Sequence, residues 1–211
     1  MLKTLINAVY PDNVACALCG EEAALNALGI CASCAPELIA PAQTPQLPYI
    51  DGLDAALVYG GAVASAMGRL KYEGARYLAP FFAGFMRIDP SWRVQALVPV
   101  PLHISKEKKR GYNQSALIAK ALSRRDGIEI IEGCLKRTRD TGTQTHNSAA
   151  QRALNVHGAF CASGVVGARV ALVDDVCTTG STLAACAKEI KNAGAYRVYA
   201  VCACYRPLKI M

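Results

Sequence analysis

The chain has no apolar segment long enough to cross a membrane. None of its hydrophobic runs approaches the roughly 20 residues that a membrane-spanning helix needs. Its first ten residues also lack the basic start, the long apolar run and the small-residue cleavage site of a secretory signal peptide. These absences exclude a membrane-spanning protein, and we expect a cytoplasmic one.

Aromatic residues and histidines are also few. Aromatics make up 7% of the 211 residues, which offers a sparse stacking platform for nucleic-acid bases. Because a lone histidine is more often a packing or surface residue, we assign a catalytic role to none of the three. There is no internal repeat or low-complexity tract. With 53% hydrophobic and 18% charged residues, the chain should form one main domain with a small appended module.

Strand-like and helix-like segments alternate along the chain from residue 55 onward. The sequence predicts strands at 55–59, 96–100, 170–173 and 196–204, and helices at 63–69, 76–86, 115–123 and 181–192. Pro41, Pro45 and Pro48 precede them and indicate a linker. This alternation predicts an α/β fold, a mostly parallel sheet flanked by helices, with ligands bound at the carboxyl ends of the strands.

Acidic, hydroxyl and glycine residues follow the strand predicted at 170–173. Asp174 and Asp175 come first, and then Cys177, Thr178, Thr179, Gly180, Ser181 and Thr182 lead into a helix. Amide groups of a glycine-containing turn and the positive end of a helix bind phosphate, and hydroxyls add donors. The two carboxylates can accept hydrogen bonds from ribose hydroxyls. An ordinary capped turn would explain some of these residues but not all of them together.

This stretch, VALVDDVCTTGST, resembles the phosphoribosyl diphosphate signature of the type I phosphoribosyltransferases. The resemblance implies that Asp174 and Asp175 bind the ribose hydroxyls and that the turn at 178–182 binds the 5-phosphate. Cys177 occupies a variable position, where a packed small side chain is expected more than a reactive thiol. The implied substrate is Mg²⁺-bound phosphoribosyl diphosphate, which loses diphosphate to an acceptor that the sequence does not identify.

A basic segment follows the predicted strand at 96–100. From 100 to 140 the chain has ten Lys and Arg against five Asp and Glu, and VPVPLHISKEKKRGYNQ reads as a strand, a basic loop and the start of a helix. Such a loop can stabilise a departing diphosphate. VPVPLH followed by RGYNQ resembles the ComF branch of the phosphoribosyltransferases, which is associated with natural competence and DNA uptake. The resemblance implies a diphosphate loop made of His103, Lys106, Lys108, Arg110, Gly111, Tyr112, Asn113 and Gln114.

A second ComF-like stretch spans 136–160 and matches the pattern R-D-T-x-x-Q and R-x-x-N. The matching positions include Arg137, Arg139, Thr141, Gln144, Arg152 and Asn155. A polar segment of this length without clear periodicity indicates a functional lid or a disordered segment. Asn147 and Gln151 depart from the family pattern. Lys71, within LKYEG, also matches a ComF segment and is either a substrate contact or a surface lysine.

Four cysteines near the start of the chain have the spacing of a metal site. Cys16, Cys19, Cys31 and Cys34 form C-x2-C, eleven residues, C-x2-C, which fits a closed, structural Zn²⁺ site. We therefore expect a zinc-binding module at 1–45 and a phosphoribosyltransferase-like domain at 46–211. The module has one basic residue against four acidic ones, so a structural or protein-docking role is favoured over DNA binding.

Two functions remain open from the sequence. The first is an enzyme that transfers a phosphoribosyl group, in a role linked to DNA uptake. The second is an adaptor that binds single-stranded DNA or a nucleotide in the same site and recruits competence or DNA-processing proteins. The basic middle of the chain supports the second function, and the complete phosphate turn supports the first.

Overall fold

The computed structural model describes residues 15–139 and 158–207. The helices and strands of this part are η1 (Ala35–Glu37), β1 (Gly52–Val58), α2 (Gly61–Tyr72), α3 (Leu78–Phe85), η2 (Pro90–Trp92), β2 (Ala96–Pro99), α4 (Ile104–Arg110), α5 (Gln114–Asp126), β3 (Glu129–Ile130), β4 (Leu135–Arg137), β5 (Phe160–Ala162), β6 (Arg169–Cys177), α7 (Ser181–Asn192) and β7 (Arg197–Tyr205), where η marks a short 3-10 helix. None of the helices described here could span a membrane.

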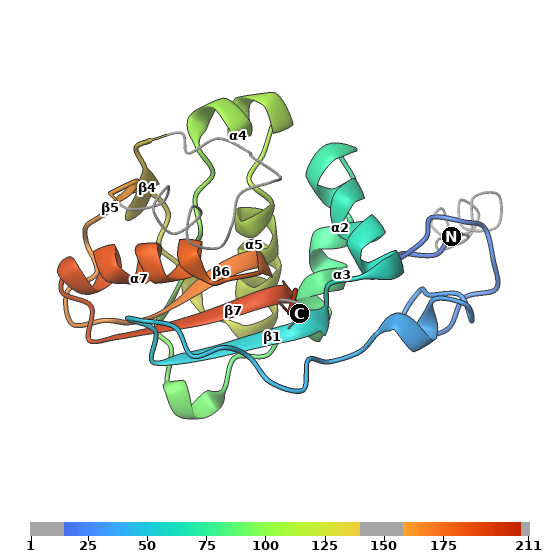
Figure 1. The fold of residues 1–211 in the computed structure, drawn as a ribbon, viewed down its shortest axis with the longest axis horizontal. Helices are drawn as coiled ribbons and strands as arrows, with labels where there is room; N and C mark the ends of the chain where they lie inside the picture. Colours follow the sequence, from blue (N-terminus) through green and yellow to red (C-terminus); the bar gives the residue numbers. More distant parts are fainter. Residues whose placement is uncertain (1–14, 140–157, 208–211) are drawn as a thin grey trace, which may run out of the picture.

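Five parallel strands form the central sheet, in the order β1-β7-β6-β2-β3. Parallel neighbours need crossover connections, and helices between the strands supply them. In Figure 1, β1, β6 and β7 all point towards the side of the molecule where α2 lies. The carboxyl ends of these strands, where ligands were expected, therefore gather near α2.

Helices cover both faces of the sheet, as predicted. α2, α3 and α5 pack against one face, where Ala171, Val173 and Val201 are buried. α7 and the antiparallel pair β4–β5 pack against the other face, where Leu172 and Ala200 are buried. The predicted fold class, a mostly parallel sheet with flanking helices and a small four-cysteine segment, is confirmed (Figure 1).

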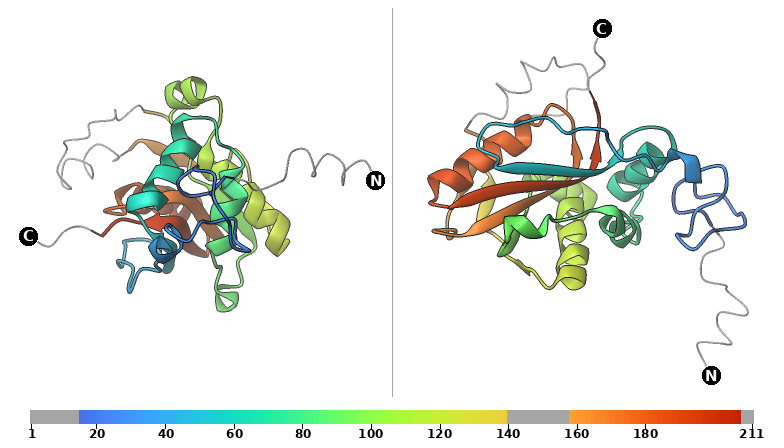
Figure 2. Two further views of the ribbon diagram at one scale, coloured as in Figure 1. Left: turned by 90° about the vertical axis from the view of Figure 1, so that its right-hand side faces the viewer. Right: turned by 90° about the horizontal axis from the view of Figure 1, so that it is seen from below.

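The four-cysteine segment packs onto the main body of the protein. Bridges between Ala15 and Glu22 and between Leu25 and Cys31 fold it into two short turns. Its Leu18 and Ile30 are fully buried and belong to the same apolar cluster as α2 and α3. Figure 2 shows the segment beyond α2, at one end of the molecule. It therefore stands next to the end of the sheet where the strands terminate.

The basic segment before RGYNQ forms a helix, whereas the sequence analysis predicted a loop. His103 caps the start of α4 by accepting a hydrogen bond from Ser105 N, and Gly111, at φ +80°, caps its end. Basic residues fill the last turn, where they interact favourably with the negative end of the helix. Glycine is the usual residue just after a helix end, so the sequence did carry a local signal for the end of α4.

Candidate functional site

Two adjacent carboxyl groups are buried near the carboxyl end of β6. Asp174 and Asp175 are 9% and 5% exposed. The strand continues through them to Cys177, whereas the sequence analysis ended it at residue 173. The pairing explains the extension, because Asp174 lies opposite Cys202 of the long strand β7. Two carboxylates inside a strand are costly unless neighbouring groups compensate them, so their contacts define the site.

Each carboxylate has a partner from a different helix. Ser115 Oγ, at the start of α5, donates a hydrogen bond to Asp174 Oδ1 at 3.0 Å. Lys71 Nζ, in the last turn of α2, lies 3.0 Å from Asp175 Oδ2, and its side chain is 18% exposed. That oxygen accepts no hydrogen bond of regular geometry from the described residues, so the ion pair compensates it. Lys71 is therefore part of the site and not a surface lysine.

One of the two acids, Asp174, changes its protonation near neutral pH. Burial, together with the negative charge of Asp175, raises the pKa of Asp174 to about 7. Burial opposes the charge on Lys71, but the nearby Asp175 carboxylate outweighs it and raises the pKa of the lysine. A carboxyl group that can keep or release its proton, beside a lysine and a second acid, can adjust its charge when a ligand brings hydroxyl groups.

The predicted phosphate turn joins β6 to α7. Gly180 occupies the left-handed region at φ +74° and is the N-cap of α7, where it offers no side-chain cap. Thr179 Oγ1 and Ser181 Oγ lie 2.8 Å apart, and Ser181 N donates to Thr179 Oγ1. The first amide groups of α7 thus lie beside several hydroxyl groups, and the turn contains no carboxylate. This arrangement is suited to binding an anion. Cys177 is 2% exposed, which fits the packed side chain that we expected.

The linker packs directly onto this turn. A Cβ built on Gly180 would lie 2.3 Å from Leu47 Cδ2, so no larger residue fits there without movement. Leu47, Pro48 and Tyr49 line a hollow of about 340 Å³ together with the start of α7. The sequence analysis had no signal for this contact, because 133 positions separate Leu47 from Gly180 in the printed sequence.

The RGYNQ residues are held by contacts within the fold. Tyr112 is buried, and its hydroxyl donates to Leu70 O of α2. Asn113 caps α5 through Ser115 N and donates to Val100 O at 2.9 Å. Gln114 accepts a hydrogen bond from Arg110. These residues support the site, whereas Lys108 and Lys109 of α4 are exposed and Lys106 is half-buried. Their contact with a diphosphate stays a prediction.

Of the predicted lid residues, Arg137 and Arg139 lie within the described part of the chain. Arg137 ends β4, and its guanidinium lies 5.4 Å from the centroid of the Phe160 ring. Arg139 follows the strand. Thr141, Gln144, Arg152 and Asn155 lie outside the described residues, as do the departures at 147 and 151. The role of this segment remains a prediction.

The four predicted metal ligands converge. The sulfur atoms of Cys16, Cys19, Cys31 and Cys34 all lie within 4.8 Å of one another. Cys19 Sγ and Cys31 Sγ are 3.9 Å apart, close to the roughly 3.8 Å edge of a zinc tetrahedron with Zn–S bonds of about 2.3 Å. Cys31 N also donates to Cys16 Sγ at 3.4 Å, as expected for a thiolate ligand. The cluster is compatible with structural zinc.

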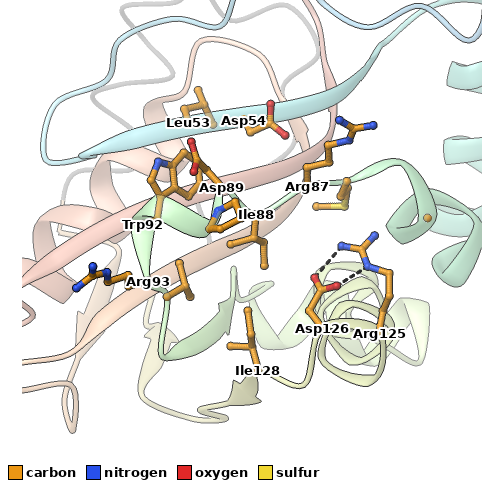
Figure 3. Close-up of a pocket in the computed structure, with 14 residues that line it drawn as sticks. Leu53, Asp54, Arg87, Ile88, Asp89, Trp92, Arg93, Arg125, Asp126 and Ile128 are labelled. Atoms are coloured by element: carbon orange, nitrogen blue, oxygen red, sulfur yellow. Dashed lines mark hydrogen bonds and ion pairs between the residues drawn. The ribbon is translucent and has the colours of Figure 1, made fainter.

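A second hollow lies at the other end of the sheet. Figure 3 shows it between β1, the segment that contains Trp92, and the end of α5. Its volume is about 890 Å³, and it is lined by Leu53, Asp54, Gly84, Met86, Arg87, Ile88, Asp89, Pro90, Trp92, Arg93, Val94, Arg125, Asp126 and Ile128. None of the residues predicted to bind substrate or metal is among them. The predicted site residues that the structure describes therefore lie outside this hollow.

A comparison with known proteins matches the part of the chain that contains Asp174, Asp175 and the turn at 178–182. Residues 108–211 match the family described as the phosphoribosyl transferase domain. Competence protein F of Haemophilus influenzae is 40% identical over 104 residues, which are 47% of this chain and 45% of that protein. This match thus spans less than half of that relative.

Two further similarities cover more of the chain. DNA utilization protein YhgH of Salmonella typhimurium is 30% identical over 217 residues, covering 90% of this chain and 96% of that protein. Among solved structures, glutamine phosphoribosylpyrophosphate amidotransferase from B. subtilis, complexed with ADP and GMP, has a TM-score of 0.39 at 22% identity. That match covers 61% of this chain and 25% of the other.

Proposed function

Because the chain belongs to the ComF family, whose domain is of the phosphoribosyltransferase type, we propose that it binds Mg²⁺-phosphoribosyl diphosphate and transfers the phosphoribosyl group in a role linked to DNA uptake. The observation that carries the proposal is the buried acid pair that leads directly into a glycine turn at a helix N-terminus. Carboxylates that can accept hydrogen bonds from ribose hydroxyls then lie a few residues from amides that can donate to a phosphate. A ribose 5-phosphate requires both kinds of group.

Different residues would bind the ribose, the 5-phosphate and the diphosphate of the substrate. Asp174 and Asp175 accept hydrogen bonds from the two ribose hydroxyls, while the turn at 178–182 and the first amides of α7 hold the 5-phosphate. In the reaction, the bond from ribose C1 to the diphosphate oxygen breaks, and the acceptor forms a new bond to C1. Lys106, Lys108 and Arg110 attract the departing diphosphate electrostatically. Magnesium enters with the substrate and shields its diphosphate charge.

Titration calorimetry with Mg²⁺ and phosphoribosyl diphosphate tests this proposal. We expect heat of binding from the wild-type protein and at least about a tenfold loss of affinity in Asp174→Asn with Asp175→Asn, because charged hydrogen bonds are lost. Asp54→Asn, at the opposite end of the sheet, is the control. Absence of binding by the wild type, or equal affinity of the double variant, would overturn the proposal. Diphosphate release with a panel of bases, amines and nucleic acids would then identify the acceptor.

A second function, binding of single-stranded DNA as an adaptor, is favoured by one surface. Tyr112 is the one aromatic residue of the basic segment at 100–140, but it is buried. Tyr72 and Tyr77 instead are 75% and 66% exposed beside the site, and Arg110 lies over the Tyr72 ring at 5.1 Å. Exposed aromatics beside basic side chains can stack bases while cations hold the backbone.

Fluorescence anisotropy with a labelled oligonucleotide tests the adaptor function. We expect affinity that falls steeply with salt, is reduced by Tyr72→Ala, and is competed by phosphoribosyl diphosphate. Tyr196→Ala is a matched control, because Tyr196 is also exposed and flanked by Arg169 and Arg197 but lies at the other end of β7. Equal losses in both variants would mean nonspecific attraction and contradict a site at Tyr72.

We also propose that Zn²⁺ fills the four-cysteine cluster and that the protein works in the cytoplasm, where thiols stay reduced. Ten cysteines without a disulfide support this environment. The module at 1–45 would then act as a structural or docking element beside the domain at 46–211. Metal analysis of the purified protein should give one zinc per chain, and its absence would contradict the proposal.

A further inference from the structure

Three consecutive residues at the end of α2 reach three separate parts of the candidate site. Arg69 contacts the four-cysteine segment, Leu70 contacts the RGYNQ segment, and Lys71 pairs with Asp175. Helix α2 therefore ends where the cysteine segment, the basic segment and the acid pair meet. A single turn of helix that holds three such contacts can transmit a change in one of them to the others.

Arg69 fastens this turn to the cysteine segment. Its Nη2 donates to Ala17 O at 2.6 Å and to Leu18 O at 3.0 Å, and both carbonyls lie between Cys16 and Cys19. The guanidinium also lies against Gly20, where a Cβ would come within 3.1 Å of Nη1. A planar guanidinium can serve two neighbouring carbonyls at once, which a lysine ammonium does less well.

The other end of α2 is fastened to the same segment. Glu37, in η1 directly after Cys34, accepts a hydrogen bond from Ala62 N at 2.6 Å. The N-cap residue Gly60 supplies no side chain, so Glu37 caps the helix from a distant part of the chain. A carboxylate at a helix N-terminus is favourable in charge as well. Both ends of α2 therefore depend on residues that flank the metal-ligating cysteines.

The last turn of α2 is held by Arg69, by the fully buried Leu70, and by the amides of Glu73 and Ala75, which donate to Arg69 O. It is followed by Glu73 and by Gly74, which lies at φ +75°, and both are exposed. Lys71 has a long, flexible side chain, so its position against Asp175 is set by where this backbone turn is held.

We propose that Arg69 is a positioning residue: it holds the last turn of α2 against the four-cysteine segment and thereby sets Lys71 against Asp175 for ligand binding. The ligand part of this inference rests on the proposed function. The cysteine segment acts on the site through this helix, without touching the substrate itself.

A double-mutant cycle in the full-length, metal-loaded protein tests the proposal. Affinity for Mg²⁺-phosphoribosyl diphosphate is measured by calorimetry for wild type, Arg69→Ala, Lys71→Ala and the double variant. We expect Arg69→Ala to weaken binding about tenfold in the wild-type background but less than about twofold in the Lys71→Ala background, because Arg69 acts through Lys71. Arg125→Ala is the matched control, since Arg125 also donates to a backbone carbonyl, Ala83 O, but beside the opposite hollow.

The outcomes separate this proposal from the proposed function. Equal effects of Arg69→Ala in both backgrounds, or no effect, would overturn the positioning role. If Arg69→Ala does not fold, Arg69→Lys enters the same cycle. If the wild type binds no phosphoribosyl diphosphate, the proposed function fails, and hydrogen exchange decides the inference. Faster exchange at both 61–72 and 170–177 in Arg69→Ala, but not in Arg125→Ala, supports it, and unchanged exchange at 170–177 overturns it.

Discussion

At the scale of single residues, the site depends on carboxyl groups that the fold does not fully stabilise. Asp174 has a hydroxyl donor in Ser115, and Asp175 has a cation in Lys71, but both acids are buried side by side. Their mutual repulsion and lost hydration cost stability that a packed apolar residue would not. Such a cost is typical of a site kept for binding, because a ligand that supplies hydrogen-bond donors recovers part of it.

Asp174→Asn should stabilise the free protein above neutral pH. The folded pKa of about 7 exceeds the roughly 3.9 of an unfolded aspartate, so the folded state binds the extra proton between these values. The stability from that proton is complete below about pH 3.9 and is lost as pH rises through about 7. Asparagine keeps an acceptor for Ser115 without the charge, so we expect a gain in stability that is larger near pH 8 than near pH 5 by on the order of 2 kcal/mol.

Urea denaturation at the two pH values measures this difference. Glu129→Gln, which neutralises an exposed carboxylate, is the control and should change stability equally little at both. A gain for Asp174→Asn that does not depend on pH would mean that Asp174 titrates normally in the folded state.

Gly180→Ala should cost more than its backbone conformation alone explains. Gly164 has the same φ of +74° with nothing within 4 Å of a built Cβ, whereas Gly180 has Leu47 there. We expect Gly164→Ala to lower the free energy of unfolding by about 1–2 kcal/mol and Gly180→Ala by about 1–3 kcal/mol more. Urea denaturation compares the two. Equal costs would show that Leu47 moves aside freely.

The sequence predicted the candidate ribose, phosphate and metal ligands and Lys71, but it did not predict the other residues that contact them. The acid pair, the phosphate turn and the four cysteines are adjacent or regularly spaced, so their types and order point to ribose, phosphate and metal. Ser115 and Leu47 meet the site only through the fold, and no local pattern marks Leu47. Ser115 did carry one available signal, because it directly follows RGYNQ and starts a helix.

At the scale of elements, long periodic segments were predicted well and short ones were missed. The helix expected at 181–192 coincides with α7, because its apolar residues repeat at helical spacing and a glycine follows it. The helix α4 and the strands β3, β4 and β5 were not predicted. They have two to seven residues each, and the hydrogen bonds of the three strands come from neighbouring strands more than from local preference.

Tyr112→Phe should loosen the connection between α2 and α5. Its hydroxyl donates to the Leu70 carbonyl in the buried space between the two helices. Removing the donor leaves that carbonyl unsatisfied, so we expect a loss of about 1–3 kcal/mol in the free energy of unfolding. Thermal and urea denaturation measure it, with the exposed Tyr196→Phe as a control that should change less than about 0.5 kcal/mol. Equal stability of both variants would mean that water or a side chain replaces the bond.

At the scale of the whole molecule, the four-cysteine segment and the domain share one core. Leu18 and Ile30 are packed in the same cluster as Leu57, Val63 and Phe82. The spacing of the cysteines predicted a metal module but gave no indication that it would be continuous with the core of α2 and α3. Domains with separate cores can unfold separately, whereas elements within one core unfold together.

Metal removal should therefore destabilise the entire protein in one step. Binding of structural zinc contributes folding free energy, and in this protein that energy would support a cluster shared with the sheet and with α2. We expect calorimetry of the chelated protein, or of Cys34→Ser, to show a single unfolding transition shifted down by at least about 5 °C. Cys161→Ser, an exposed cysteine outside the cluster, should retain the metal and the wild-type transition. Two transitions, with the main one unchanged after chelation, would show instead that the segment folds independently and that α2 stands without it.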